Sequence, residues 1–232
     1  MNFRSLIFVP IVLLAAVLTA GALERTASDP FLIPSQEPET VISADSLELK
    51  ANTVILRGKV RAVRGNDVLT CEKALLRHKP QWLLATMTPK LFRKESVSEK
   101  MVLRETQLEA ENILWEEATD RINASPSVTV KIEERSWDLA TYTWAVISAD
   151  EMEGFRDQQI LNFLSNVKLL DKTRYAEGRK LEYFKASSTA VLSGQVRMES
   201  EEFDPKSRKM VKRLINGERV IYNMQTKEAF TE

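Results

Sequence analysis

The chain has 232 residues, in which 33 lysines and arginines balance 33 aspartates and glutamates. This balance excludes the basic excess that draws a protein onto nucleic acid, and the chain carries no acidic tail. The single cysteine, Cys71, excludes an intrachain disulfide, so the fold must rely on core burial and backbone hydrogen bonds.

The first 22 residues are predicted to be a signal peptide. Arg4 precedes an apolar run from Ser5 to Leu23, and Ala20-Gly21-Ala22 forms an A-x-A cleavage site. The run is about 19 residues long, close to the roughly 18–20 that a membrane helix needs, so an uncleaved anchor at residues 5–23 is the alternative. Residues 23–40, rich in Pro, Ser and Thr, are expected to be a linker. In either case the domain at residues 41–232 lies outside the cytoplasm.

From residue 41 onward, short runs of alternating apolar residues predict β-strands. TVILRGKVRAV, ILNFLSNVKLL and AVLSGQVRME each alternate around a small residue, namely Gly58, Ser165 and Gly194. The pentapeptide VISAD occurs at Val41–Asp45 and again at Val146–Asp150, and we interpret it as the start of a strand used twice. Together these patterns predict a series of antiparallel hairpins with loops of varying length.

Residues 93–121 are the ambiguous stretch. RKESVSEKMVLRETQLEAENILWEEATDR holds enough Glu, Lys and Leu for a helix, but LEAENILWEEATDRINASPSVTV matches the hairpin pattern of the other repeats. Strands are therefore expected there, with a helix as the alternative.

No catalytic or metal-binding constellation stands out. The one histidine, His78, is typical of a loop residue, and no Ser-His-Asp or Cys-His arrangement can be built without it. One cysteine and one histidine cannot form a zinc site, and no Gly-rich phosphate loop is present, so neither a metal nor a cofactor is expected. Cys71 is expected to be a small buried strand residue.

Neighbouring carboxylates do not indicate a glycosidase. Glu116-Glu117, Glu133-Glu134 and Glu201-Glu202 would point to opposite faces of a strand, and we expect them to be solvated strand ends and turns. The tryptophans are expected in the core or at its rim rather than as a sugar-stacking platform: Trp82, Trp115, Trp137 and Trp144. The sequence therefore does not predict an enzyme.

The repeats share the pattern A-D-x-L, a short turn, L-x-G-x-V, then G-x-x-x-L-x-(A/C) and a second strand. Residues 42–76, ISADSLELKANTVILRGKVRAVRGNDVLTCEKALL, carry it best, followed by residues 175–196, YAEGRKLEYFKASSTAVLSGQV. The copies at 147–170 and 110–130 are weaker, because neither has the glycine of the turn. This pattern resembles the OstA-like family, to which the periplasmic lipopolysaccharide-transport proteins of LptA and LptC type belong.

The resemblance implies an all-β fold, an antiparallel β-jellyroll or V-shaped taco of two sheets built from repeated hairpins. It implies a periplasmic component that shields the lipid A acyl chains of lipopolysaccharide in an apolar groove and passes them toward the outer membrane. The implied partners are lipopolysaccharide and other transport proteins of the same fold, stacked edge strand to edge strand. A homo-oligomer built in the same way is left open.

The residues predicted to face the lipid lie on the strands around Gly58, Ser165 and Gly194, and the alternative is that they fill a closed core. They are Val54, Leu56, Val60, Leu161, Phe163, Val167, Leu192 and Val196. Alternatives for the whole protein are an LptC-like acceptor anchored in the inner membrane by residues 5–23 and facing the periplasm, and a structural or adhesive β-repeat domain without lipid. An enzyme acting on an envelope glycan ranks third.

Overall fold

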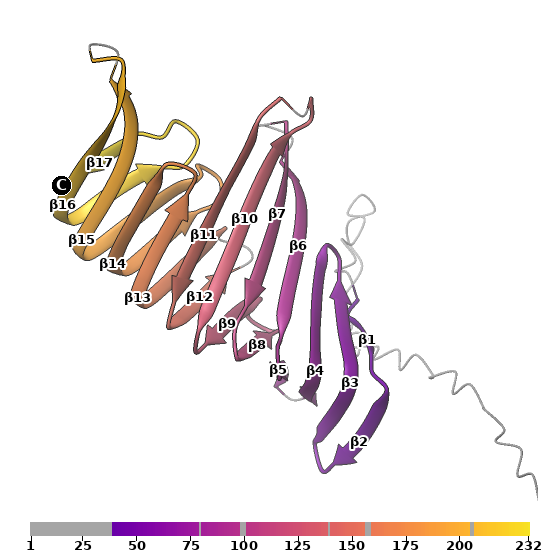
Figure 1. Cartoon of the computed structure of the whole chain (residues 1–232). Helices are drawn as coiled ribbons and strands as arrows, with labels where there is room; N and C mark the ends of the chain where they lie inside the picture. The colour runs from indigo at the N-terminus through magenta and orange to yellow at the C-terminus, as the bar shows by residue number, and fades with distance from the viewer. Residues whose placement is uncertain (1–38, 79, 98–100, 139, 156–158, 205–206) are drawn as a thin grey trace, which may run out of the picture.

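The computed structural model describes residues 39–78, 80–97, 101–138, 140–155, 159–204 and 207–232, and these form one continuous antiparallel sheet (Figure 1). The all-β prediction is confirmed. Alternating apolar and polar residues produce this fold, because successive side chains of a strand point to opposite faces. The described residues include no helix long and apolar enough to span a bilayer. The predicted signal peptide, its anchor alternative and all but the end of the linker lie outside the described residues.

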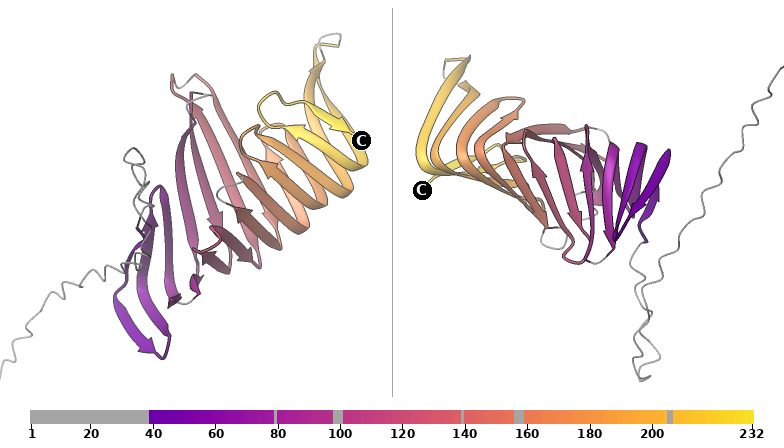
Figure 2. Two further views of the ribbon diagram at one scale, coloured as in Figure 1. Left: turned by 180° about the vertical axis from the view of Figure 1, so that it is seen from behind. Right: turned by 90° about the horizontal axis from the view of Figure 1, so that it is seen from below.

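Within the described residues, seventeen strands make up the sheet, stacked in chain order from the indigo end to the yellow end in both views of Figure 2. Their bounds are β1 (Val41–Ser43), β2 (Ser46–Lys50), β3 (Thr53–Arg64), β4 (Asp67–His78), β5 (Gln81–Thr86), β6 (Lys90–Val97), β7 (Val102–Glu109), β8 (Asn112–Glu116), β9 (Arg121–Ser125), β10 (Val128–Ser136), β11 (Tyr142–Ala149), β12 (Glu151–Phe155), β13 (Ile160–Asp171), β14 (Arg174–Phe184), β15 (Thr189–Asp204), β16 (Lys209–Asn223) and β17 (Ala229–Thr231).

The sheet is folded lengthwise into two half-sheets. The upper half-sheet contains the short strands β1, β6, β7, β10 and β11, and the lower one contains β2, β5, β8, β9, β12 and β17. The long strands β3, β4, β13, β14, β15 and β16 run through both: the first part of β4 pairs with β6 and its second part with β5, for example. Continuous backbone therefore joins the two half-sheets along one line.

We call this fold line the spine, and bulges and tight bends mark it. The ladder shifts register between Arg57 and Val60, where Gly58 and Lys59 have φ values of 71° and 46°. The same positive-φ pair recurs at Ser165-Asn166 and at Gly194-Gln195. Bulges bend a strand and sharpen its twist, so the small residues that interrupt the apolar alternation are the points where the sheet turns.

The two copies of VISAD lie differently in their strands: the first supplies the whole of β1, whereas the second is the last part of β11. β1 ends at Ser43 and β11 at Ala149, and the aspartate that follows lies at the spine. The backbone N–H of Asp45 donates to the Gly58 carbonyl at 2.9 Å, and that of Asp150 donates to the Ser165 carbonyl at 3.0 Å. VISAD is therefore a piece of an upper strand together with its bend at the spine. The prediction that it starts a strand is correct for the first copy, where β1 begins at Val41, and wrong for the second copy, which ends β11.

Residues 93–121 form β6, β7, β8 and the start of β9 with turns between them, and their described part contains no helix, so the strand prediction is confirmed there. The tryptophans are spread widely: Trp115 is buried, Trp82 and Trp144 are half-buried, and Trp137 is exposed. Cys71 is buried in β4 as expected, and burial raises the pKa of its thiol. His78 is the last residue of β4.

Candidate functional site

The space between the two half-sheets is filled by one apolar layer that runs the length of the stack. All eight residues predicted to face lipid belong to this layer; seven are buried, and Val54 is half-buried at its edge. Val60, Val167 and Val196 come from the upper half-sheet and the other five from the lower. The structure thus brings the predicted residues to one interior, and their contact with lipid stays a prediction.

A small cavity of about 40 Å³ lies near the middle of this layer, with room for a few water molecules at most. Of the eight predicted residues, only Leu161 lines it. Its walls come from β6, β7 and β10 above, and from β9, β12, β13 and the turn after β14 below. The lining residues are Leu91, Arg93, Thr106, Leu108, Ile122, Val130, Met152, Gly154, Leu161 and Lys185. An acyl chain needs more room than this, so the half-sheets would have to move apart to admit one.

The edge opposite the spine, which we call the mouth, is lined by charge. Apolar residues occupy the inner positions near the spine, whereas the inner positions farthest from it on the upper half-sheet are polar. We call this row the mouth ladder; it comprises Arg64, Asp67, Arg93, Glu95, Arg104, Glu134, Asp171, Arg174 and Ser200, and all but Arg93 and Glu95 are buried.

Opposite charges face each other in register along this ladder. Asp67 pairs with Arg93 across β4 and β6, and two hydrogen bonds of 2.5 and 2.6 Å join guanidinium to carboxylate. Arg104 of β7 lies between Glu95 and Glu134, and its Nε donates to Glu134 Oε1 at 2.8 Å. Buried charges are tolerated where they are paired in this way.

The mouth ladder also binds the turns of the lower half-sheet. Arg64 Nη1 lies 3.1 Å from Asp120 Oδ1, and Arg104 Nη2 donates to the Lys185 carbonyl at 2.9 Å. The Ser188 hydroxyl donates to Glu134 at 3.3 Å. Among the backbone–backbone hydrogen bonds of the described residues, none joins the two half-sheets at the mouth. Side chains alone hold the mouth closed there.

A buried cluster around Asp171 also closes the mouth. Its carboxylate accepts hydrogen bonds from the Tyr222 hydroxyl, from Lys227 Nζ at 2.9 Å and from the Thr173 backbone N–H at 2.8 Å. Burial by itself would raise the pKa of Asp171, but these hydrogen bonds outweigh it and hold the pKa below its usual value. The Arg174 guanidinium lies 4.8 Å from the centre of the Tyr222 ring.

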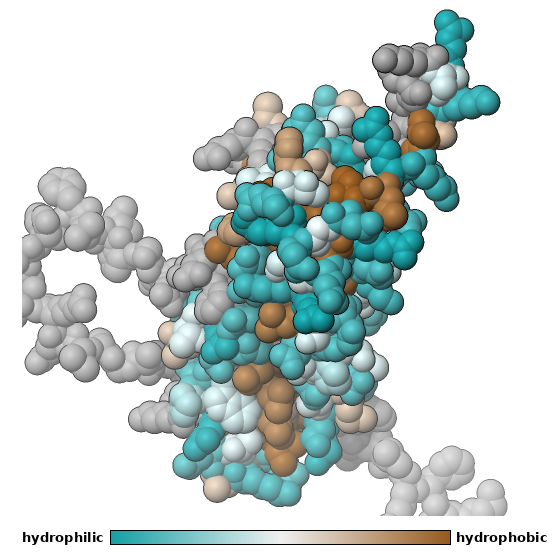
Figure 3. All heavy atoms as spheres, turned by 90° about the vertical axis from the view of Figure 1, so that its left-hand side faces the viewer, coloured by the Kyte–Doolittle hydropathy of each residue, from teal (hydrophilic) through white to brown (hydrophobic). Residues whose placement is uncertain are grey.

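Both ends of the stack expose apolar side chains beside strand edges. β1 and β2 pair only with β3 within the described residues, and Leu47 and Leu49 of β2 are exposed. At the other end, residues 209–217 of β16 pair on one side only in the described part of the chain. Figure 3 looks onto this end, where hydrophobic residues form patches; the exposed ones of β16 and β17 include Leu214 and Phe230.

Sequence reasoning missed the mouth ladder, although a signal for it exists. In KLFRKE, VTVKIEE and VKLLD, a charged residue sits in phase with the apolar face at the end of the alternating run. The expectation that all neighbouring carboxylates are solvated was wrong for Glu134, which is 8% exposed. It points inward from β10 while Glu133 points outward.

Comparison with known proteins identifies a family whose model matches this chain. The family model described as "LptA/(LptD N-terminal domain) LPS transport protein" matches residues 41–228. The solved structures similar to this chain include the crystal structure of LptH, the LptA-homologous periplasmic component of the lipopolysaccharide transport device of Pseudomonas aeruginosa. That likeness has 13% sequence identity and a TM-score of 0.30, and it covers 77% of this chain and 94% of LptH. A search of curated proteins finds no match.

Proposed function

Since this chain belongs to the LptA/LptD N-terminal domain family of lipopolysaccharide transport proteins, we propose that it is a periplasmic carrier that shelters lipid A acyl chains between its half-sheets. The observation that carries this proposal is the contrast between the two long edges of the molecule. The spine is continuous backbone, whereas side chains alone close the mouth in the described residues. Such a sheet can open along the mouth while the spine stays intact.

The apolar layer supplies the driving force. Each buried CH₂ contributes about 0.8 kcal/mol, so one 14-carbon chain held out of water is stabilised by on the order of 10 kcal/mol. An opened interior would exchange contacts between the half-sheets for contacts with acyl chains. Because one apolar surface replaces another, lipid entry need not cost the hydrophobic stabilisation of the core.

The free edges at both ends support transfer along a row of such molecules. Unpaired strand edges add further strands readily, and exposed apolar residues such as Leu47 and Leu214 would be covered in the process. In this proposal a neighbouring transport protein of the same fold extends the apolar layer at each end and receives the lipid. A homo-oligomer and an inner-membrane-anchored acceptor remain the alternative arrangements.

The test is photo-crosslinking from within. We would replace Leu161, which lines the cavity, by the photoreactive p-benzoyl-phenylalanine, purify the exported protein without detergent, and irradiate it with lipopolysaccharide. Leu164 lies on the outer face of the same strand and is 38% exposed, so the same replacement there is the matched control.

Crosslinked lipid A at position 161 and not at 164, identified by mass spectrometry, would support the carrier. Equal labelling at both positions, or none at 161 in a folded protein, would instead favour a closed core and a structural or adhesive domain. Recovery in the periplasmic fraction, with an N-terminus at Leu23, would distinguish a cleaved carrier from an anchored acceptor.

A further inference from the structure

Lys185 differs from the other cations around the cavity because its ammonium has no partner in the described part of the chain. The side chain is 4% exposed and lines the cavity, and within the described residues Lys185 Nζ makes no hydrogen bond or ion pair. Burial, helped by the nearby Arg93 guanidinium, lowers its pKa to about 8. A buried ammonium normally has a counter-charge, since its desolvation is costly.

The carboxylates near Lys185 are already occupied. Asp67 accepts two hydrogen bonds from Arg93, and Glu134 accepts from Arg104. Glu95 lies 3.5 Å from Arg93 and 3.8 Å from Arg104, between the two guanidinium groups. Lys185, which lies where the apolar cavity meets the mouth ladder, therefore has no carboxylate partner among the described residues.

Resting on the carrier function proposed above, we propose that Lys185, with Arg93 beside it, is the seat of an anionic group of the bound lipid, a phosphate on its sugar headgroup. The acyl chains would extend from there between Leu161 and Met152, and the phosphate would replace the missing counter-charge at the mouth. The site suits both parts of an anionic amphiphile. The mostly apolar cavity walls suit its acyl chains, and the cation at the charged rim of the cavity suits its anionic group.

The backbone around Lys185 favours this placement. Its N–H donates to the Gln159 carbonyl at 2.9 Å, and its own carbonyl accepts from Arg104 and from the Ser188 N–H. The main chain is therefore fixed by both half-sheets, while the ammonium is uncommitted within the described residues. Gly154 opposite has no side chain, and a Cβ there would lie 3.0 Å from Leu161 Cδ2, so the cavity is there partly because this position is glycine.

The experiment compares two lipids on the full exported protein: lipid A with both phosphates, and the same lipid A after chemical removal of its phosphates. The wild-type protein is expected to bind the phosphorylated form at least 10-fold more tightly. Lys185→Met should lose this preference while binding the dephosphorylated lipid as before, and Lys185→Arg should restore it. Lys180→Met is the control, because Lys180 lies on β14, the strand that leads into Lys185, and pairs with Glu182 at 2.9 Å.

A preference retained in Lys185→Met, or absent in the wild type, would overturn the assignment of the anion seat while leaving the carrier intact. If the wild type binds neither lipid, the carrier proposal itself fails. The pKa of Lys185, followed by NMR during titration with inorganic phosphate, then decides on the anion seat alone. A rise in this pKa would identify a free-phosphate site, and an unchanged pKa would overturn the seat as well.

Discussion

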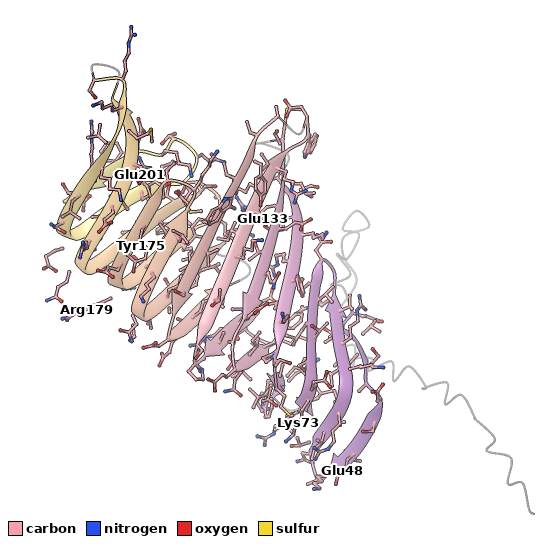
Figure 4. All side chains as sticks on the ribbon, in the orientation of Figure 1. Glu48, Lys73, Glu133, Tyr175, Arg179 and Glu201 are labelled. Carbon is pink, nitrogen blue, oxygen red and sulfur yellow. The ribbon has the colours of Figure 1, made fainter. Side chains whose placement is uncertain are left out.

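The spine and the mouth are the two long edges of the same folded sheet, and they are closed by opposite means. At the spine the half-sheets share backbone, and neighbouring bends interlock: the stem of Arg179, which projects from this edge in Figure 4, packs over Gly194, and its guanidinium donates to Gln195. At the mouth the half-sheets are joined by salt bridges and by hydrogen bonds that side chains make to side chains and to backbone carbonyls. A hinged sheet needs one edge that stays joined and one that can open. The spine is the edge that stays joined, and the mouth is the edge that can open.

The largest effect is expected from locking the mouth. Gln225 Nε2 of the lower half-sheet lies 3.4 Å from Glu134 Oε2 of the upper one. In a Cys71→Ala background, a Glu134→Cys/Gln225→Cys protein treated with a short, reducible thiol–thiol crosslinker should lose uptake of fluorescent lipopolysaccharide almost completely. Reduction should restore uptake, so the same molecule is its own folding control. Undiminished uptake while crosslinked would mean that lipid does not enter through an opening mouth.

Breaking the Asp171 cluster should weaken the closed state. Asp171→Asn removes a buried charge that side-chain and backbone donors share, so the free energy of unfolding at pH 7 should fall by about 3 kcal/mol. Because the folded-state pKa is lowered, the wild-type advantage is present above the unfolded pKa of about 3.9 and is lost as the pH falls through the lower folded-state pKa. Urea unfolding of both proteins between pH 2 and 7 measures this.

The matched control for this prediction lies at the spine. Asp150 accepts a hydrogen bond from the Asn166 side chain at 2.6 Å in an exposed position. Asp150→Asn should change stability by less than about 0.5 kcal/mol. Equal losses for the two variants would contradict the view that polar side chains matter more at the mouth than at the spine.

Changes at the bends of the spine are expected to have a smaller effect than the loss of the Asp171 charge. Gly58 has φ +71°, and a Cβ there would lie 2.6 Å from Asp45 Oδ2, so Gly58→Ala should lower the free energy of unfolding by about 1–2 kcal/mol. Gly217 also lies at the spine, but its φ is not positive and a Cβ would have its nearest neighbour at 3.7 Å. Gly217→Ala should be neutral, or stabilising by less than about 1 kcal/mol. Thermal and denaturant unfolding of the pair decide the point.

Alternation of apolar residues was enough to predict the strands and to place all eight candidate residues on the interior face. It was not enough to show that the second VISAD ends a strand, because a period of two shows which face a residue occupies and not where along a strand the sheet bends. The mouth ladder was not predicted from the sequence for a related reason. Charged residues at the ends of strands are normally expected to be exposed to solvent. Here they are buried by turns of the opposite half-sheet, as Glu134 is by the turn that contains Ser188.

The order of strand pairing has a further consequence, for folding and for evolution. Each described strand pairs only with strands at most three places away in the chain, as β7 does with β10. A molecule built from such local pairings resembles a repeat protein, in which neighbouring units form successively and the terminal units unfold first. Its length can also change by duplication or loss of a whole hairpin without disturbing the pairing of the rest. The distance spanned by a single chain would then be an evolvable quantity, adjusted in units of one hairpin.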